Sequence, residues 1–151
     1  MNKRYLVVFI FWAFLTNAQN QLPISNGSLE TIDPQTNSFS FCSNFQTNEV
    51  QAEYSIETEN LILGSTKAQK SEIINLGANG WHVKTHSDFL FQVEAGMTYT
   101  VRFWAKSNSS SAVLKVVFQS EVSGSFQGID QNLTQEWQQY VHSFTVAESA
   151  D

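Results

Sequence analysis

The stretch GMTYTVRFWAKSNSSSAVLKVVFQS, residues 96–120, decides the fold class because it reads as two β-strands joined by a polar loop. Apolar side chains occupy every second position from Tyr99 to Phe103, which is the pattern of a strand with one buried face. The same period of two places Trp104 on the opposite, solvent-facing side beside Arg102. A solvent-facing indole on a strand calls for a functional explanation.

Strand-like composition recurs along the chain, and clusters of Gly, Asn and Ser separate the segments. The segments expected to form strands are Ala52–Thr58, Ser71–Leu76, Gly80–Thr85, Asp88–Glu94, Met97–Lys106, Ala112–Gln119 and Gln138–Ala147. No helical period stands out, and Leu22–Val50 is expected to be irregular. Many short strands with regular turns predict an all-β sandwich or barrel in one domain.

The alternation within residues 96–120 also predicts a register. A hairpin with its loop at Ser107–Ser110 brings the two apolar faces together, with Phe103 opposite Leu114. This register places Arg102 opposite Lys115, a like-charge pair that costs up to about 1 kcal/mol. Its outer face would combine an aromatic floor with polar side chains.

A second interpretation of that outer face needs no ligand. Trp104 would lie beneath a neighbouring loop, and Arg102 would form an ion pair with a carboxylate such as Asp88 or Glu94. The sequence leaves both interpretations open.

The first 18 residues read as a signal peptide. Lys3 and Arg4 precede an apolar run from Tyr5 to Leu15, and small residues predict cleavage near Ala18. No later segment approaches the roughly 20 apolar residues of a membrane-spanning helix. We therefore expect residues 19–151 to be a secreted, soluble module, extracellular, cell-surface or periplasmic.

The formal net charge of −6 becomes more negative once the basic leader is removed, which disfavours nucleic acid and anionic membranes as partners. The chain is rich in Ser, Thr, Asn and Gln. Such a composition suits the binding of neutral polar ligands such as sugars, and it suits the surface of an ordinary secreted β-protein equally well.

Catalytic residues do not stand out. Cys42 is the only cysteine and has no motif around it, so we expect a half-buried structural thiol. A glycosidase would need a pair of carboxylates at a defined separation. Nothing in the spacing of the acidic residues selects such a pair, and the available ones are Glu53, Glu57, Glu59 and Glu72. We expect the chain not to be an enzyme.

Four parts of the chain together resemble one known family. They are NGSLE at 26–30, the Trp and Val of WHV at 81–83, VEAGMTYTVRFWAKS at 93–107 and LTQEWQQYVHSFTV at 133–146. These segments are similar to those of the CenC-type carbohydrate-binding modules, the group of families four, nine and twenty-two. The resemblance runs from about residue 26 to the end, and it implies a jelly-roll β-sandwich of the galactose-binding-domain-like class.

The resemblance also implies a function, the non-catalytic binding of β-glucan, xylan or a related polysaccharide by a module attached to, or derived from, a glycoside hydrolase. Sugar rings stack on aromatic planes, and their hydroxyls hydrogen-bond to Arg, Gln and Asn. Trp81 and Trp137 also match positions that often pack structurally in the family. The candidate binding residues are Trp104, Arg102, Gln119, Trp81, His82 and Phe126.

Two departures from the family pattern accompany the resemblance. Members continue past the FTV strand, whereas this chain ends at VAESAD, so we expect it to lack its last strand or strands. The family's structural calcium site would take one oxygen from Glu30, but Ca²⁺ needs six to eight oxygens and no full set is evident. The alternative function is that of a secreted adhesion or interaction domain without glycan specificity.

Overall fold

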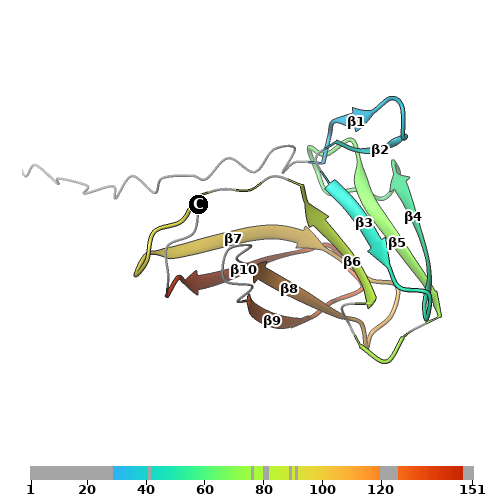
Figure 1. The fold of residues 1–151 in the computed structure, drawn as a ribbon. Coiled ribbons are helices and arrows are strands. Elements are labelled where there is room, and N and C mark those ends of the chain that lie inside the picture. The colour runs from blue at the N-terminus through green and yellow to red at the C-terminus, as the bar shows by residue number, and fades with distance from the viewer. Residues whose placement is uncertain are drawn as a thin grey trace, which may run out of the picture.

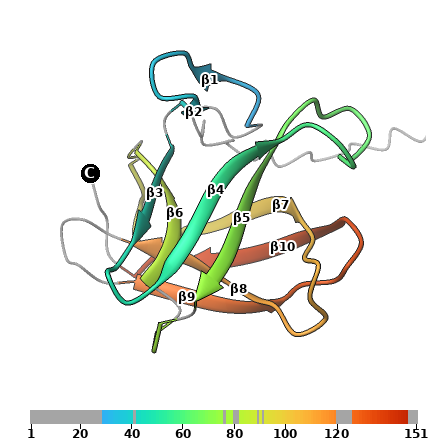
Figure 2. The same cartoon turned by 90° about the vertical axis from the view of Figure 1, so that its right-hand side faces the viewer.

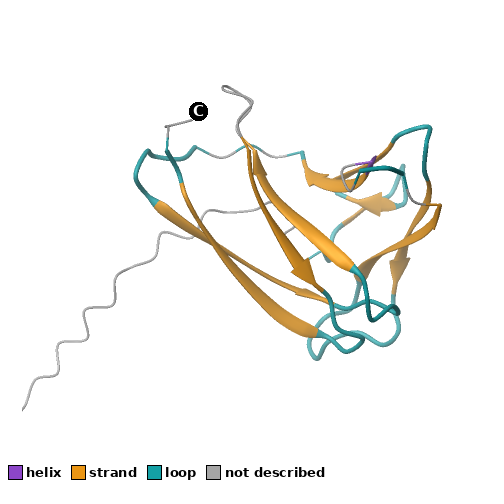
Figure 3. Cartoon of the chain, turned by 90° about the horizontal axis from the view of Figure 1, so that it is seen from below, coloured by secondary structure: helices purple, strands orange, loops and turns teal. Residues whose placement is uncertain are grey.

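The computed structural model describes residues 29–40, 42–75, 77–79, 82–88, 90, 92–119 and 126–147. These residues form strands and loops, apart from a short 3₁₀ turn at His82 (Figure 3). The prediction of an all-β chain is confirmed. The described part of the chain has no helix that could span a bilayer. The expected signal peptide lies outside the described residues.

The strands form antiparallel pairs: β1 with β2, β3 with β6, β4 with β5, β7 with β10 and β8 with β9. Figure 1 shows β7–β10 and β8–β9 together at one end of the molecule, and β3–β6 and β4–β5 at the other. The architecture is a jelly-roll β-sandwich. The strands are β1 (Ile32–Asp33), β2 (Ser38–Phe39), β3 (Cys42–Gln46), β4 (Gln51–Glu57), β5 (Ala68–Asn75), β6 (Val83–Ser87), β7 (Thr98–Ala105), β8 (Val113–Gln119), β9 (Phe126–Asn132) and β10 (Gln138–Thr145).

Three expectations about the strands were wrong. The supposedly irregular segment Leu22–Val50 contains β1, β2 and β3, and the described residues of Asp88–Glu94 contain no strand. The sequence FQGIDQN, which lies in none of the expected strands, forms β9. Gly, Asp and Asn have low strand propensity, but cross-strand pairing with β8 overrides that propensity.

The predicted hairpin of β7 with β8 was also wrong. β7 pairs with β10, so that Phe103 lies opposite Tyr140, and β8 pairs with β9, so that Lys115 lies opposite Asp130. The ring of Phe118 on β8 lies 6.5 Å from that of Tyr99, with the two planes nearly parallel. β8 therefore packs its inner face against the inner face of β7 from the facing sheet.

Aromatic rings fill the space between these two sheets. Phe144 on β10 is 4% exposed, and its ring centroid lies 5.4 Å from that of Phe118. Farther along, the ring of Phe103 lies 5.6 Å from that of Tyr140. Phe103 is half-buried rather than nearly fully buried as the alternation suggested, and Leu114 is 37% exposed.

Polar side chains connect the other two strand pairs. The side-chain amide of Gln69 on β5 donates to Asn44 Oδ1 on β3 at 2.8 Å and to Thr85 Oγ1 on β6 at 2.6 Å. The Thr85 hydroxyl in turn donates to Asn44 Oδ1 at 2.7 Å. These bonds hold β4–β5 alongside β3–β6, the arrangement visible in Figure 2.

The hydroxyl of Tyr140 fixes the loop at the Trp104 end of β7. The Thr134 amide donates to the Tyr140 hydroxyl oxygen at 3.1 Å, and the Ser107 amide donates to the Thr134 carbonyl at 2.8 Å. Tyr140→Phe should therefore lower the free energy of unfolding by about 1 kcal/mol, because the Thr134 amide loses its acceptor while the ring remains. Urea denaturation at neutral pH measures this. An unchanged midpoint would show that water replaces the hydroxyl without cost.

Candidate functional site

The exposed side of β7 and β10 forms one continuous face, called here the β7–β10 outer face. Exposed and half-buried positions alternate strictly along β7. Every residue of the outer face is exposed, as the period of two predicted for β7. Its members are Thr98, Thr100, Arg102 and Trp104 on β7, and Gln139, Val141, Ser143 and Thr145 on β10.

The antiparallel register orders this face from an aromatic end to a hydroxyl end. Trp104, 47% exposed, lies opposite Gln139 at the aromatic end. At the other end the hydroxyls of Thr98 and Thr145 are hydrogen-bonded at 2.9 Å. The next pair along the strands, Thr100 and Ser143, repeats this bond at the same distance. The face thus offers a flat ring for stacking beside hydroxyls and an amide that can hydrogen-bond to a ligand.

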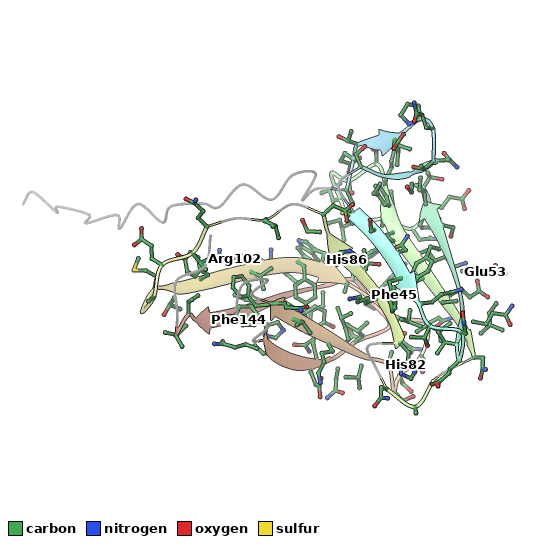
Figure 4. All side chains as sticks on the ribbon, in the orientation of Figure 1. Phe45, Glu53, His82, His86, Arg102 and Phe144 are labelled. Atoms are coloured by element: carbon green, nitrogen blue, oxygen red, sulfur yellow. The ribbon has the colours of Figure 1, made fainter. Side chains whose placement is uncertain are left out.

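Arg102 lies between these two ends, opposite Val141. Figure 4 shows that Arg102 and the buried Phe144 lie on opposite sides of the β7–β10 pair. The ion pairs among the described residues do not include Arg102. The ion pair of Arg102 with Asp88 or Glu94, which the second interpretation required, is therefore absent from the described residues. Asp88 instead accepts a hydrogen bond from the Ser43 hydroxyl at 2.8 Å.

Gln119 does not lie beside Trp104, as it would in the predicted hairpin of residues 96–120. It ends β8 and lies opposite Phe126 on β9. Because Phe118 points into the sandwich, the next side chain along the strand, Gln119, points to the outer surface of the facing sheet. The side chain of Phe126 and the whole of Trp81 lie outside what the structure describes.

His82, a candidate binding residue from the sequence, is 4% exposed, which indicates a packing position. Its Nδ1 lies 3.4 Å from Glu49 Oε2, and its Nε2 lies 3.3 Å from Asn79 Nδ2. The imidazole also comes so close to Gly77 that a Cβ there would lie 2.1 Å from Nδ1. An imidazole enclosed by Val50 and the 77–79 loop has little surface left for a ligand.

Trp137 packs structurally, as the family resemblance suggested. Its Nε1 donates to the Asn60 carbonyl at 2.6 Å, and the Lys106 ammonium lies 5.1 Å from the centre of its ring. Lys106 also donates to the Asn60 carbonyl, at 3.1 Å. Among the tryptophans that the structure describes, Trp104 is therefore the one that presents an exposed ring on a strand face.

Sequence reasoning missed the β10 half of the outer face. In QQYVHSFT the apolar positions Tyr140 and Phe144 face inward, so the period of two already predicts an outward Gln139. What the sequence did not supply was the pairing of this segment with β7, because the two strands lie far apart along the chain.

Comparison of the sequence with known families identifies the family of the chain. The sequence pattern of a carbohydrate-binding domain, of the type of modules four and nine, matches residues 24–151. The chain belongs to this carbohydrate-binding domain family. No curated protein sequence matches the carbohydrate-binding domain significantly. The resemblance noted in the sequence is thus confirmed, and the β7–β10 outer face is a candidate binding surface within a family defined by sugar binding.

The described residues around Glu30 do not complete a calcium site. The Glu30 carboxylate accepts hydrogen bonds from the Ser65 hydroxyl at 2.8 Å, from the Thr66 amide at 3.0 Å and from the Thr66 hydroxyl. The Lys67 ammonium lies 3.9 Å away, where it would repel a cation. No group of three or more His, Cys, Asp or Glu side chains suited to a metal ion occurs among the described residues.

The hydrogen bonds to Glu30 predict a loss of stability in acid. Bonds from the Thr66 side chain and amide and from Ser65 lower the pKa of Glu30 from 4.5 to about 2. The stabilisation by the ionised carboxylate is present above 4.5 and is lost as the pH falls through the folded-state pKa. Urea midpoints of the carbohydrate-binding domain and its Glu30→Gln variant should therefore differ more near pH 6 than near pH 3. A difference independent of pH would contradict this assignment.

Cys42 of the carbohydrate-binding domain is half-buried at the start of β3 and has no disulfide partner, as expected. Burial raises the pKa of the Cys42 thiol, and the charge of Asp88 raises it further. Because the thiolate is the reactive form, this thiol is a poor nucleophile.

A small pocket lined by polar and apolar side chains lies at β2–β5. Asn44 and Gln69 line it, but their side chains are already hydrogen-bonded to each other. Tyr54 also lines it, and its hydroxyl donates to the Phe45 carbonyl at 2.9 Å. These groups serve the contact between strand pairs, so the β7–β10 outer face remains the stronger candidate in the described part of the domain.

Proposed function

We propose that the chain is a secreted, non-catalytic module that binds a polysaccharide of the β-glucan or xylan type on the β7–β10 outer face. The observation that carries the proposal is the exposed ring of Trp104, held on a strand face beside Arg102. The apolar face of a sugar ring stacks on an indole, and neighbouring amide, hydroxyl and guanidinium groups bind the hydroxyls around its edge.

The absence of acids on this face supports binding without catalysis. Hydrolysis of a glycosidic bond uses two carboxyl groups flanking the bond. β7 and β10, all of whose residues are described, contain no Asp or Glu. The polysaccharide would be bound and released unchanged, and a catalytic domain elsewhere in a parent glycoside hydrolase would act on it.

Affinity electrophoresis tests the proposal directly. Native gels containing soluble β-glucan or xylan should retard the chain relative to a gel without polysaccharide, whereas serum albumin should migrate equally in all gels. Incubation with the same glycans should release no reducing sugar. Migration unaffected by any glycan would favour the secreted adhesion domain instead, and release of reducing sugar would contradict the non-catalytic role.

A further inference from the structure

Arg102 is the one formally charged side chain of β7 and β10, whose residues are all described. It is exposed, and its neighbours on the outer face are Thr100, Trp104 and, across the strands, Val141. The chain as a whole carries a formal net charge of −6. An acidic protein has many carboxylates with which to neutralise an arginine, yet none of the described ones forms an ion pair with Arg102.

The described lysines differ from Arg102 in this respect, because each of them has an intramolecular partner. Three form ion pairs, Lys67 with Glu30, Lys70 with Glu72 and Lys115 with Asp130. The other two lie over aromatic rings, Lys84 over Phe45 and Lys106 over Trp137, each with its ammonium 5.1 Å from the ring centre. Among the basic side chains that the structure describes, Arg102 is thus the one available to a ligand.

A guanidinium has a specific ligand preference. It presents parallel N–H donors in a planar fork that matches the two oxygens of a carboxylate or a sulfate. Bonds to charged groups contribute about 1.5–3 kcal/mol, against about 1 kcal/mol for neutral ones. Arg102 precedes Trp104 by two positions on the same face, a separation of about 7 Å from the strand rise. A ring stacked on Trp104 would therefore place a substituent of that sugar or of its neighbour over Arg102.

We propose that the polysaccharide bound at the β7–β10 outer face carries an anionic substituent, a carboxylate or a sulfate ester, which Arg102 binds bidentately. The inference rests on the proposed function and narrows it to acidic glycans. The hydroxyl pairs of Thr100 with Ser143 and of Thr98 with Thr145 would then face the uncharged part of the same chain.

The test compares matched glycans by isothermal titration calorimetry on the full chain. The probes are a glucuronoxylan, the same glucuronoxylan after reduction of its carboxyl groups to alcohols, a neutral β-glucan and that β-glucan after sulfation. Affinity for one charged probe should exceed that for its neutral counterpart by about tenfold or more. A preference for the glucuronoxylan would identify the substituent as a carboxylate, and a preference for the sulfated β-glucan would identify it as a sulfate.

Arg102→Gln should remove this preference, because it should lower the affinity for the charged probe by about tenfold more than the affinity for its neutral counterpart. Arg102→Lys, which keeps the charge but not the fork, should recover only part of it. Lys115→Gln is the matched control, because it removes one positive charge from the facing sheet, and it should keep the full preference. Thermal unfolding of each variant verifies that it is folded.

Two results would overturn the inference in distinguishable ways. Equal affinity for charged and neutral probes, or an equal loss on both in Arg102→Gln, would mean that Arg102 binds hydroxyls, and the proposed function would stand without an anionic ligand. No measurable binding of any probe would overturn the proposed function together with the inference.

Discussion

Trp104→Ala is expected to remove most glycan binding while the domain stays folded. Aromatic side chains at the centre of a binding surface contribute about 2 kcal/mol or more, which corresponds to a loss of affinity of about thirtyfold or more. The indole is 47% exposed and lies on the face opposite the buried ring of Phe144. Its removal therefore leaves little cavity behind. Affinity electrophoresis measures the binding, and urea denaturation measures the stability.

Two variants on the same face serve as controls for Trp104. Trp104→Phe keeps an aromatic plane and should retain a large part of the affinity, whereas Thr98→Ala, at the far end of the face, should change it little. A folded Trp104→Ala protein that binds glycan as tightly as the parent would place the binding surface elsewhere. A large loss of stability would mean that the indole is part of the packing.

Phe144→Ala is expected to have the largest effect on stability. Phe144 is 4% exposed and stacks on Phe118 from the facing sheet, so its truncation removes a contact between the two layers. Burial of this kind contributes about 3–5 kcal/mol, a large part of the 5–15 kcal/mol of a typical domain. Chemical denaturation should show a correspondingly lower midpoint or an unfolded protein at 25 °C.

Val141→Ala is the matched control for the core substitution. It lies three positions earlier on the same strand, with 51% of its surface exposed. Its truncation should change the free energy of unfolding by no more than about 0.5 kcal/mol. If Val141→Ala were as damaging as Phe144→Ala, the inner and outer faces of β10 would be assigned the wrong way round.

The faces of β7 could be predicted from the sequence, but its partner strand could not. Alternation of apolar side chains reports which side of a strand is buried, and it correctly separated Phe103 from Trp104. The same alternation is satisfied whether β8 continues the sheet as a hairpin or packs on its inner face from a second sheet. Both arrangements bury Phe118, so the pattern does not distinguish them.

That ambiguity accounts for the misplaced candidate Gln119. In a hairpin Gln119 would share a face with Trp104, whereas in facing sheets the two point to opposite outer surfaces. His82 is a different case. It became a candidate through the family resemblance, and nothing in the local sequence reveals that the 77–79 loop and Val50 enclose it.

The pairing of β7 with β10 has a consequence for how the protein acquires its activity during folding. The chain between Ala105 and Gln138, which contains β8 and β9, must close as a loop for Trp104 and Gln139 to meet. Closing such a long loop costs entropy and slows the step that completes the sheet. Before β10 pairs with β7, the indole of Trp104 lacks the neighbouring strand that completes the outer face. In a refolding experiment, glycan affinity should therefore recover later than the first strand formation, at the step in which β10 pairs with β7.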